Sequence, residues 1–221
     1  MGSGSRRAPA VLGAALAVLA LAAAAPARAE DDERGRELFT FCQQCHGEEA
    51  GGNPLALAPS IAGLPAYYVK RQLSNFHAGV RGTHFDDYSG MRMRAMSLWL
   101  GTDANIEAVT AYIAALPPVK PAPIVQGGNA AAGAALYATC AACHGPEGKG
   151  NEAMGSPPLD HQSDWYLLTQ LQHFKAGIRG SNSKDTQGAL MRPMANLLPN
   201  EQAMKDVVAY IMSFRIQTAQ K

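Results

Sequence analysis

The chain has little of several features that usually direct an interpretation. Its 221 residues include only four cysteines, which all fall within residues 42–46 and 140–144, so none is left elsewhere for a structural disulfide. Basic residues are not in excess, because 19 Lys and Arg face 18 Asp and Glu for a net charge of +1, which is too little for a nucleic-acid-binding protein. We also find no convincing pair of strands. The chain is therefore expected to be all-α.

The two cysteine segments share one pattern, C-Q-Q-C-H and C-A-A-C-H. C-x-x-C-H is the attachment sequence of c-type haem, in which one helical turn presents both sulfurs to a porphyrin edge and the histidine offers a ring nitrogen to iron. A zinc knuckle, a thioredoxin-like redox pair and structural disulfides are the alternatives. A zinc site usually combines two cysteine pairs in one module, and a redox pair needs no following histidine. The pattern therefore predicts two covalent haem c groups attached at Cys42, Cys45, Cys140 and Cys143, with His46 and His144 as axial ligands.

The first 29 residues have the features of a signal peptide. Arg6 and Arg7 form a basic start, residues 11–25 are rich in alanine and leucine, and residues 27–29 fit a cleavage site. A membrane anchor is the alternative, but the apolar stretch is short for a span and Pro26 interrupts it. Haem attachment of this type follows export. We therefore expect the mature protein in a bacterial periplasm, soluble or loosely membrane-associated.

An offset of 98 residues relates the two halves of the chain. It matches the cysteine motifs, and it also matches residues 78–82 with 176–180. Between the copies lies the stretch P-P-V-K-P-A-P, followed by two glycines, which is typical of an extended linker. The sequence therefore predicts a signal peptide over 1–29, an N-terminal cytochrome c domain over 30–118, a linker over 119–128 and a C-terminal cytochrome c domain over 129–221.

The two halves differ in charge. Residues 30–118 carry 7 Lys and Arg against 11 Asp and Glu, a formal charge of −4, whereas residues 119–221 carry 9 against 7, a charge of +2. This polarity would orient the molecule toward charged partners, although ordinary surface variation explains it equally well.

Each copy is expected to contain three helices joined by long loops. In the N-terminal copy they run from about Asp32 to Cys45, from near Pro65 to a cap at Gly79, and from Thr102-Asp103 to Pro117. The counterparts of the second and third helices begin near Ser163-Asp164 and Asn200-Glu201. About 90 residues are few for a hydrophobic core, and a covalently held porphyrin adds the apolar body that so small a domain needs.

Methionines are the candidates for the second axial ligand. They are Met91, Met93 and Met96 in the N-terminal copy and Met191 and Met194 in the C-terminal copy. Methionine favours reduced iron and raises the potential, which suits an electron carrier. The offset retains the pairs Met93/Met191 and Met96/Met194. We choose Met96 and Met194, which come just before the last helix, over the alternative that these methionines fill the core.

No other histidine recurs in both copies. His77, His84, His161 and His173 correspond to Lys175, Asn182, Gly63 and Asn75 under the offset. We therefore expect surface positions, and no haem ligation, for these four histidines.

Further recurring residues are expected to surround the haems. The carbonyl groups of Pro59 and Pro157 are placed to accept the N–H of the ligand imidazoles and fix their orientation. Aromatic residues open the second helix of each copy and an arginine follows it. They are expected at haem edges and carboxylates, with core packing and solvent exposure as the alternatives. The candidates for this haem shell are Pro59, Tyr67, Tyr68, Arg81, Pro157, Trp165, Tyr166 and Arg179.

With these motifs in place, the chain resembles the dihaem cytochromes c of the c4 type, which consist of two fused class I cytochrome c domains. The resemblance rests on both C-x-x-C-H motifs, the segments 72–79 and 170–177, the pairs Gly35/Phe39 and Gly133/Tyr137, and Tyr112 and Tyr210. It implies His46/Met96 and His144/Met194 ligation and haems that face each other across the domain interface. It also implies electron delivery to a membrane terminal oxidase.

The expected function is electron transfer in a respiratory chain, from a quinol-oxidising complex to a terminal oxidase, without a small-molecule substrate. Fully ligated iron has no open position for catalysis, so the protein tunes a potential and presents a haem edge. Two alternatives share this body. One is the electron-accepting subunit of a periplasmic dehydrogenase, such as a sulfide-oxidising flavocytochrome, and the other is a dihaem peroxidase or thiosulfate dehydrogenase. The paired methionines favour a carrier over an enzyme, but they do not separate a free carrier from a fixed subunit.

Overall fold

A computed structural model describes residues 1–2 and 33–218, so almost all of the expected signal peptide lies outside the described residues. The described chain is helical, and its only extended pairings are the isolated bridges Asn53–Ala58 and Asn151–Ser156. The expected all-α fold is confirmed. The elements are a first helix over 33–46, η1 (Pro54–Ala56), α2 (Ala66–His77), α3 (Tyr88–Leu100), α4 (Asp103–Ala115), α5 (Ala130–His144), α6 (Asp164–Ala176), α7 (Thr186–Asn196) and α8 (Glu201–Thr218).

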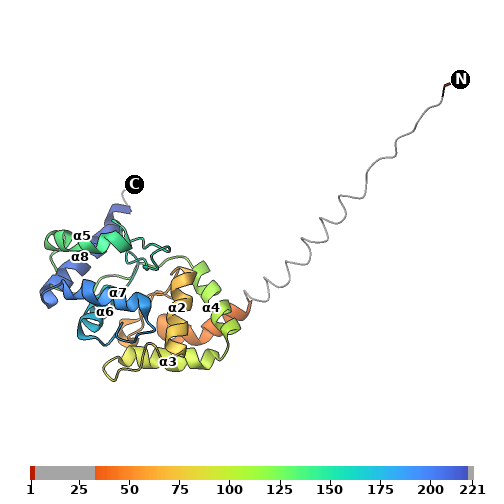
Figure 1. Ribbon diagram of the computed structural model, residues 1–221, viewed down its shortest axis with the longest axis horizontal. Coiled ribbons are helices and arrows are strands. Elements are labelled where there is room, and N and C mark those ends of the chain that lie inside the picture. The colour runs from red at the N-terminus through yellow and green to blue at the C-terminus, as the bar shows by residue number, and fades with distance from the viewer. Residues whose placement is uncertain (3–32, 219–221) are drawn as a thin grey trace.

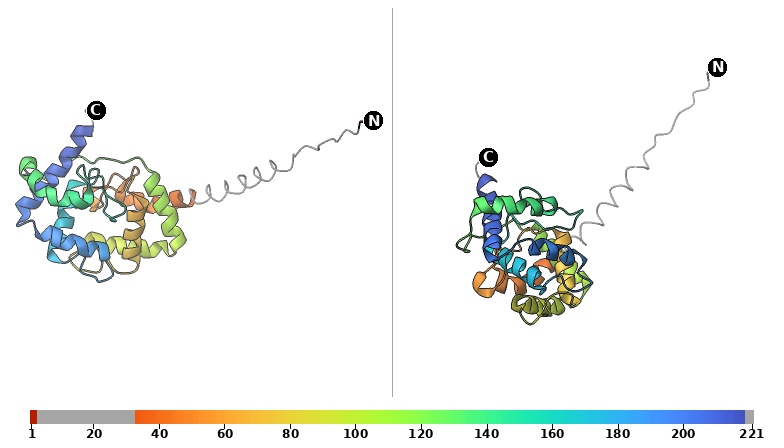
Figure 2. Two further views of the ribbon diagram at one scale, coloured as in Figure 1. Left: turned by 45° about the horizontal axis from the view of Figure 1, so that its top comes forward. Right: turned by 60° about the vertical axis from the view of Figure 1, so that its left-hand side comes forward.

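The helices form two halves that lie side by side. Figure 1 shows α2, α3 and α4 in one half and α5 to α8 in the other, with the connecting segment running over the surface. Figure 2 shows the same division from two further directions. No helix of the described residues has the length and apolar character needed to span a membrane.

In each half a glycine lets the first and last helices cross closely. A Cβ on Gly35 would lie 2.4 Å from the Ala108 carbonyl oxygen of α4, and one on Gly133 would lie 1.9 Å from the Asp206 carbonyl oxygen of α8. Aromatic rings pack beside both crossings, with centroid distances of 5.2 Å for Phe39 and Tyr112 and 5.5 Å for Tyr137 and Tyr210. This shared crossing brings the C-x-x-C-H end of each first helix to the hydrophobic core.

The expectation of three helices per copy is wrong, because each copy has a fourth. The methionines lie inside α3 and α7 and not in loops ahead of the last helix. Asp87 and Asp185 begin these helices, and their carboxylates accept hydrogen bonds from the backbone N–H groups of Gly90 and Gly188 at 2.9 Å. The helices therefore start on a side-chain cap.

Most of the remaining boundaries follow the expected signals, but the C-cap of α2 is Ala78 and not Gly79, which comes next with a φ of 67°. Thr102 caps α4 with its side chain, and Gly177 ends α6 in the left-handed conformation. Ser163 occupies the cap position of α6, but its side chain makes no capping bond. Its hydroxyl oxygen instead accepts a hydrogen bond from the Ser60 N–H of the other half at 3.2 Å, so the domain interface uses this side chain.

The linker is fixed to both halves. The Ser60 hydroxyl donates to the Val119 carbonyl at 3.4 Å. Further along, the backbone N–H groups of Ile124 and Val125 donate to one carboxylate oxygen of Asp164 at 2.7 and 2.6 Å. These contacts hold the linker against the surface, as expected for a proline-rich connection.

Candidate haem sites

Each half contains a cavity at its C-x-x-C-H segment. The N-terminal cavity has a volume of about 350 Å³ and is bordered by Cys42, Cys45 and His46. The C-terminal cavity has a volume of about 170 Å³ and is bordered by Cys140, Cys143 and His144. Apolar side chains form most of the remaining walls, among them Leu73, Phe76, Val109 and Ile113 in the first and Leu167, Phe174, Val207 and Ile211 in the second. Such walls suit a large, flat, apolar group.

A proline carbonyl orients the histidine of each cavity. His46 Nδ1 lies 2.8 Å from the Pro59 carbonyl oxygen, and His144 Nδ1 lies 2.8 Å from that of Pro157. Burial lowers the pKa of both imidazoles below the usual value of 6.5, although the proline carbonyls act in the opposite direction. Each ring is therefore neutral at pH 7 with its proton on Nδ1, which leaves Nε2 with the lone pair that a metal requires.

The cysteines have properties that oppose the redox and zinc alternatives. None of the four cysteines forms a disulfide, and burial raises the pKa of the Cys42 thiol to about 11 and that of the Cys140 thiol above its usual value. Redox-active C-x-x-C pairs have a lowered thiol pKa. The described residues also contain no group of three or more His, Cys, Asp and Glu side chains that would hold a metal ion. Attachment to an organic group explains these thiols better.

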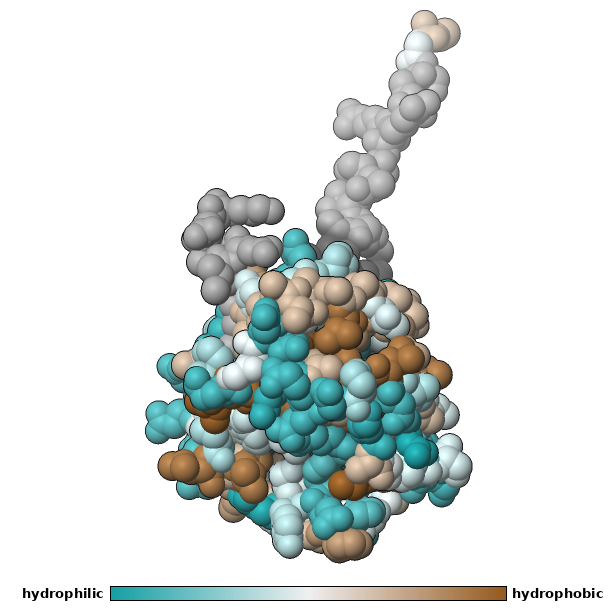
Figure 3. Space-filling model, turned by 90° about the vertical axis from the view of Figure 1, so that its left-hand side faces the viewer, coloured by the Kyte–Doolittle hydropathy of each residue, from teal (hydrophilic) through white to brown (hydrophobic). Residues whose placement is uncertain are grey.

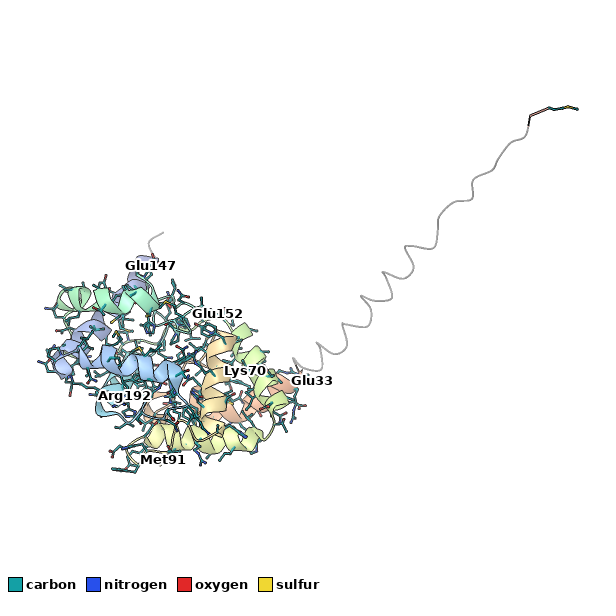
Figure 4. All side chains as sticks on the ribbon, in the orientation of Figure 1. Glu33, Lys70, Met91, Glu147, Glu152 and Arg192 are labelled. Carbon is teal, nitrogen blue, oxygen red and sulfur yellow. The ribbon has the colours of Figure 1, made fainter. Side chains whose placement is uncertain are left out.

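Two methionines border each cavity. Met93 and Met96 line the N-terminal cavity, and Met191 and Met194 line the C-terminal one, each pair separated by about one helical turn. Met91 is 37% exposed and is not part of the cavity wall. Figure 4 shows it on α3 at the outer edge of the molecule. The structure thus brings two candidate sulfur ligands to each cavity and removes the third from the N-terminal one.

Comparison with known proteins matches both halves to one family. The family model "Cytochrome c" matches residues 33–117 and again residues 130–215. The chain belongs to the cytochrome c family. Its two C-x-x-C-H segments, neutral histidines and apolar cavities fit two covalently bound haem c groups.

Two-domain relatives cover most of this cytochrome. It is 31% identical to cytochrome c4 of Stutzerimonas stutzeri over 78% of this chain and 84% of that protein. It is 33% identical to the thiosulfate dehydrogenase electron acceptor of the same species (strain A1501) over 70% of this chain and 72% of that protein. These relatives support a dihaem class I cytochrome of the c4 type.

Solved structures give the same result. Reduced cytochrome c4 from Pseudomonas stutzeri superimposes with a TM-score of 0.64 at 26% identity, covering 81% of this chain and 96% of that one. A thiosulfate dehydrogenase (TsdBA) from Marichromatium purpuratum superimposes with a TM-score of 0.67 at 33% identity, covering 81% of this chain but 39% of that one.

The expected haem shell of this cytochrome is partly assembled at the cavities. Pro59, Tyr68, Tyr166, Arg81, Pro157 and Arg179 all border a cavity. Tyr67 and Trp165 border neither. The Tyr67 hydroxyl donates instead to the Ser156 carbonyl of the other half at 2.7 Å, and Trp165 packs edge-on against Tyr166 at 5.9 Å.

Three glutamines at the cavities were not anticipated. Gln72 borders both cavities, Gln162 borders both, and Gln170 borders the C-terminal one. Tyr68 and Tyr166 also border both, so each cavity is completed by residues of the other domain. A signal for two of the glutamines was present, because Gln72 and Gln170 are separated by the 98-residue offset of the repeat.

The expectation of surface positions is wrong for two histidines. His161 is 8% exposed, and its Nδ1 lies 2.9 Å from Asp160, a carboxylate that also binds Lys149. His173 is largely buried at the domain interface, with its Nδ1 3.7 Å from Asp87 of the other half. A histidine without a repeat partner can therefore be buried, beside a carboxylate of its own half for His161 and beside one of the other half for His173.

Proposed function

We propose that this dihaem cytochrome is a periplasmic electron carrier that passes electrons from a quinol-oxidising complex to a membrane terminal oxidase. The observation that carries the proposal is a pair of apolar cavities, each with a neutral histidine and two methionines, that share walls across the domain interface. A bound haem c supplies a one-electron iron couple at each site. We propose His46 and Met96, and His144 and Met194, as the axial ligands.

The side chains around each site set the reduction potential of the haem iron. Burial of His46 and His144 keeps them neutral, and their bonds to Pro59 and Pro157 hold the rings in one orientation. A thioether opposite a neutral imidazole favours reduced iron and raises the potential. Ligation of each haem by its histidine and the proposed methionine would leave no position for a substrate, which supports a carrier over a dihaem peroxidase.

An apolar rim at the N-terminal cavity supports docking of a redox partner there. Phe41, Leu57 and Trp99 border this cavity and are 52%, 47% and 46% exposed. Under the offset their counterparts are Thr139, Gly155 and Leu197, which form a less apolar set. The face over the C-terminal half, which Figure 3 shows, carries hydrophobic residues only in small separate groups. Exposed aromatic residues beside a redox centre are typical of transient partner contacts.

A second candidate function is supported by the relatives. Proteins named as thiosulfate dehydrogenase electron acceptors are 33% and 34% identical to this chain, and a solved thiosulfate dehydrogenase contains a region of the same fold. In this alternative the chain accepts electrons from a dehydrogenase of reduced sulfur compounds, as a free carrier or as its bound subunit. The same two cavities serve both functions, and only the donor differs.

A stopped-flow experiment separates the two donors. The oxidised holoprotein is mixed with a quinol-oxidising complex and quinol, or with thiosulfate dehydrogenase and thiosulfate, and haem reduction is followed by absorbance. Fast reduction by the quinol-oxidising complex and fast reoxidation by a terminal oxidase are the expected results. Fast reduction only in the thiosulfate reaction would support the second candidate. Rapid peroxide turnover or ready binding of carbon monoxide by the native protein would contradict both carrier functions.

A further inference from the structure

An arginine of α3 lies beside the haem attachment segment of the N-terminal half. Its Nη1 donates to the Ala56 carbonyl oxygen at 2.7 Å, and its Nη2 lies 3.4 Å from the Cys45 sulfur. This residue, Arg92, borders the N-terminal cavity together with Met93 and Met96 of the same helix. An arginine is charged at any ordinary pH. A positive charge therefore lies next to a sulfur of the haem attachment motif and one residue away from a candidate ligand.

The C-terminal half has an apolar residue at the equivalent position. Under the 98-residue offset Arg92 corresponds to Leu190, and Ala56, whose carbonyl holds the arginine, corresponds to Met154. Leu190 and Met154 both border the C-terminal cavity and are 64% and 43% exposed. The two cavities therefore differ in charge at a position that the repeat otherwise makes equivalent.

The other charged side chains around the cavities do not cancel this difference. Arg81 borders the N-terminal cavity and its counterpart Arg179 borders the C-terminal one, so this pair contributes one charge to each site. Arg71 and Asp185 also border the C-terminal cavity, and their opposite charges add up to zero. The N-terminal cavity thus has one positive charge more than the C-terminal one, and Arg92 supplies it.

The charge of Arg92 acts on the histidine of its own cavity. Burial lowers the pKa of His46, the Pro59 carbonyl raises it, and Arg92 lowers it again because a nearby cation disfavours a second positive charge. At His144 the causes are burial, which lowers the pKa, and the Pro157 carbonyl, which raises it. The same effect applies to iron, since its oxidised form carries one positive charge more than its reduced form.

We propose that Arg92 makes the N-terminal haem the centre of higher reduction potential, so that the N-terminal domain holds the electron of the singly reduced protein. The proposal rests on the proposed function only in requiring haem in both cavities. A cation beside the centre destabilises ferric iron relative to ferrous iron, which raises the potential. One electron then passes from ferrous iron in the C-terminal domain, which is oxidised, to ferric iron in the N-terminal domain, which is reduced.

This order places the electron beside the apolar rim of the N-terminal cavity. Phe41 and Trp99 of that rim pack against each other with ring centroids 4.3 Å apart, and both border the cavity. Electrons that enter through either domain would collect in the N-terminal one and leave for the acceptor across this rim.

Stepwise reduction of the wild-type holoprotein tests the order without any partner protein. The oxidised fraction of each haem is read from its haem methyl proton resonances, which are assigned to a domain by nuclear Overhauser contacts to residues of that cavity. At half reduction we expect the N-terminal haem to be mostly reduced and the C-terminal haem to be mostly oxidised. A C-terminal haem that is reduced first would overturn the proposal, and this result requires no variant.

Exchange of the two equivalent residues tests the role of the side chain. R92L gives the N-terminal cavity the residue of the C-terminal one, and its N-terminal potential should fall while the C-terminal potential stays the same. L190R is the reciprocal change and should raise the C-terminal potential alone. R92K keeps the charge and should retain most of the wild-type N-terminal potential. If the potential falls as far in R92K as in R92L, charge is not the cause and the proposal is wrong.

Arg36 provides a matched control. It lies on the first helix of the same half, pairs with Glu33 at 3.7 Å, is 67% exposed and does not border the cavity. R36L removes the same charge from the same domain and should leave both potentials nearly unchanged, because an exposed charge is screened by solvent. Equal shifts in R36L and R92L would assign the effect to the net charge of the domain and overturn the role of Arg92.

Two further outcomes remain decisive. If R92L does not take up haem, the order of reduction in the wild type and the shift in L190R still decide the proposal. Failure of electron transfer with every tested donor would refute the proposed function, whereas the order of the two potentials would remain measurable.

Discussion

His46 and His144 show how a single backbone carbonyl decides the chemistry of an imidazole. A neutral ring has one N–H, and the bond to Pro59 or Pro157 places that proton on Nδ1. Nε2 is then the only nitrogen with a lone pair. The acceptor lies 13 residues along the chain in both halves, so the same short loop sets tautomer and direction together.

We predict that Met96→Leu converts one haem from low spin to high spin and leaves the other unchanged. Leucine has a similar volume but no sulfur, so the cavity stays filled while the ligand is lost. Near-infrared absorption from sulfur-to-iron charge transfer should fall by about half, because two similarly ligated centres contribute equally. Met194→Leu should produce the same loss from the other domain.

The matched control for this prediction is Met93→Leu. Met93 lies one turn away on α3 and borders the same cavity, so the substitution changes the wall without changing the proposed ligand. An unchanged near-infrared spectrum is expected. Loss of half the band in Met93→Leu, with the band intact in Met96→Leu, would transfer the ligand role to Met93 and, through the repeat, to Met191.

We predict that Asp160→Asn removes an acid-sensitive part of the stability. Burial alone would raise the pKa of Asp160, but hydrogen bonds from His161 and Lys149 lower it from 3.8 to about 2. Because the folded pKa is below the unfolded one, this stabilisation is complete above pH 3.8 and is lost as the pH falls toward 2. The variant should lose about 2 kcal/mol of unfolding free energy at pH 7. Its unfolding free energy should also decrease less steeply than that of the wild type as the pH falls into the acid range.

Denaturant unfolding at several pH values, followed by circular dichroism, checks this. Asp86→Asn is the control, since its side chain is 53% exposed, and its effect should stay within about 0.5 kcal/mol. Equal effects of the two substitutions at pH 7 would contradict the role given to the buried carboxylate.

At the residue scale the sequence predicted what depends on local geometry. The cysteines, the histidines of the motifs and the proline carbonyls all follow from one helix and one loop. His161 and His173 did not follow, because their partners are a buried aspartate and a residue of the other domain. Charge pairing of that kind leaves no periodic trace in the sequence.

The helices α3 and α7 carry the methionines, and the sequence did not reveal them as helices. Each contains glycine in its first turn, and α7 has Pro193 inside, both of which are unfavourable in helices. Neither segment shows a clear apolar face by inspection. The signal that was overlooked is the cap, because Asp87 and Asp185 stand at equivalent positions and both bind a backbone N–H three residues on. Caps and breakers predicted α2, α4, α6 and α8, whereas the first helix and α5 were expected only because they carry the C-x-x-C-H motifs.

We predict that Gly133→Ala destabilises the C-terminal half. The added Cβ would lie 1.9 Å from the Asp206 carbonyl oxygen and 3.0 Å from Tyr210 Cβ, so α5 and α8 must move apart. Overpacking of this kind costs about 1–3 kcal/mol, and it opposes the gain of up to about 1 kcal/mol that alanine brings to a helix. A net loss of thermal stability is expected, measured by the melting temperature of the holoprotein.

Ala135→Ser serves as the control for this element. Residue 135 is exposed on the same helix, so its effect should remain within about 0.5 kcal/mol. If Gly133→Ala melts at or above the wild-type temperature, the crossing of α5 and α8 accommodates a Cβ at this position without strain.

The arrangement of the whole molecule depends on reciprocal contacts between the two copies. Asn75 of α2 lies 3.5 Å from Asp185 of the C-terminal half, and the equivalent His173 of α6 lies 3.7 Å from Asp87 of the N-terminal half. The repeat predicted two similar domains but not this docking, since docking is set by side chains that meet only after both domains have folded. The two contacts are equivalent in place, but only the second contains a histidine.

We predict that this difference makes the domain interface sensitive to pH through His173. Burial lowers its pKa below 6.5, while Asp87 raises it and Arg81, Arg179 and His84 lower it further. The unfolded chain therefore binds a proton more readily, and the unfolding free energy should decrease as the pH falls below 6.5 toward the folded pKa. His173→Asn reproduces the residue of the other copy and should remove this part of the pH dependence. The other histidines are common to both proteins and cancel in the difference.

Chemical unfolding of the wild-type holoprotein and of His173→Asn, compared at steps on both sides of pH 6.5, measures the effect. The difference in stability should shift in favour of the variant as the solution becomes more acidic and stay constant on the alkaline side. His77→Asn is the control, because this histidine lies 2.9 Å from the Ser97 carbonyl oxygen of its own half and is not among the groups that shift the pKa of His173. Parallel curves for wild type and His173→Asn would mean that the Asp87 carboxylate compensates the burial of His173 fully, and that the interface does not respond to protons at this position.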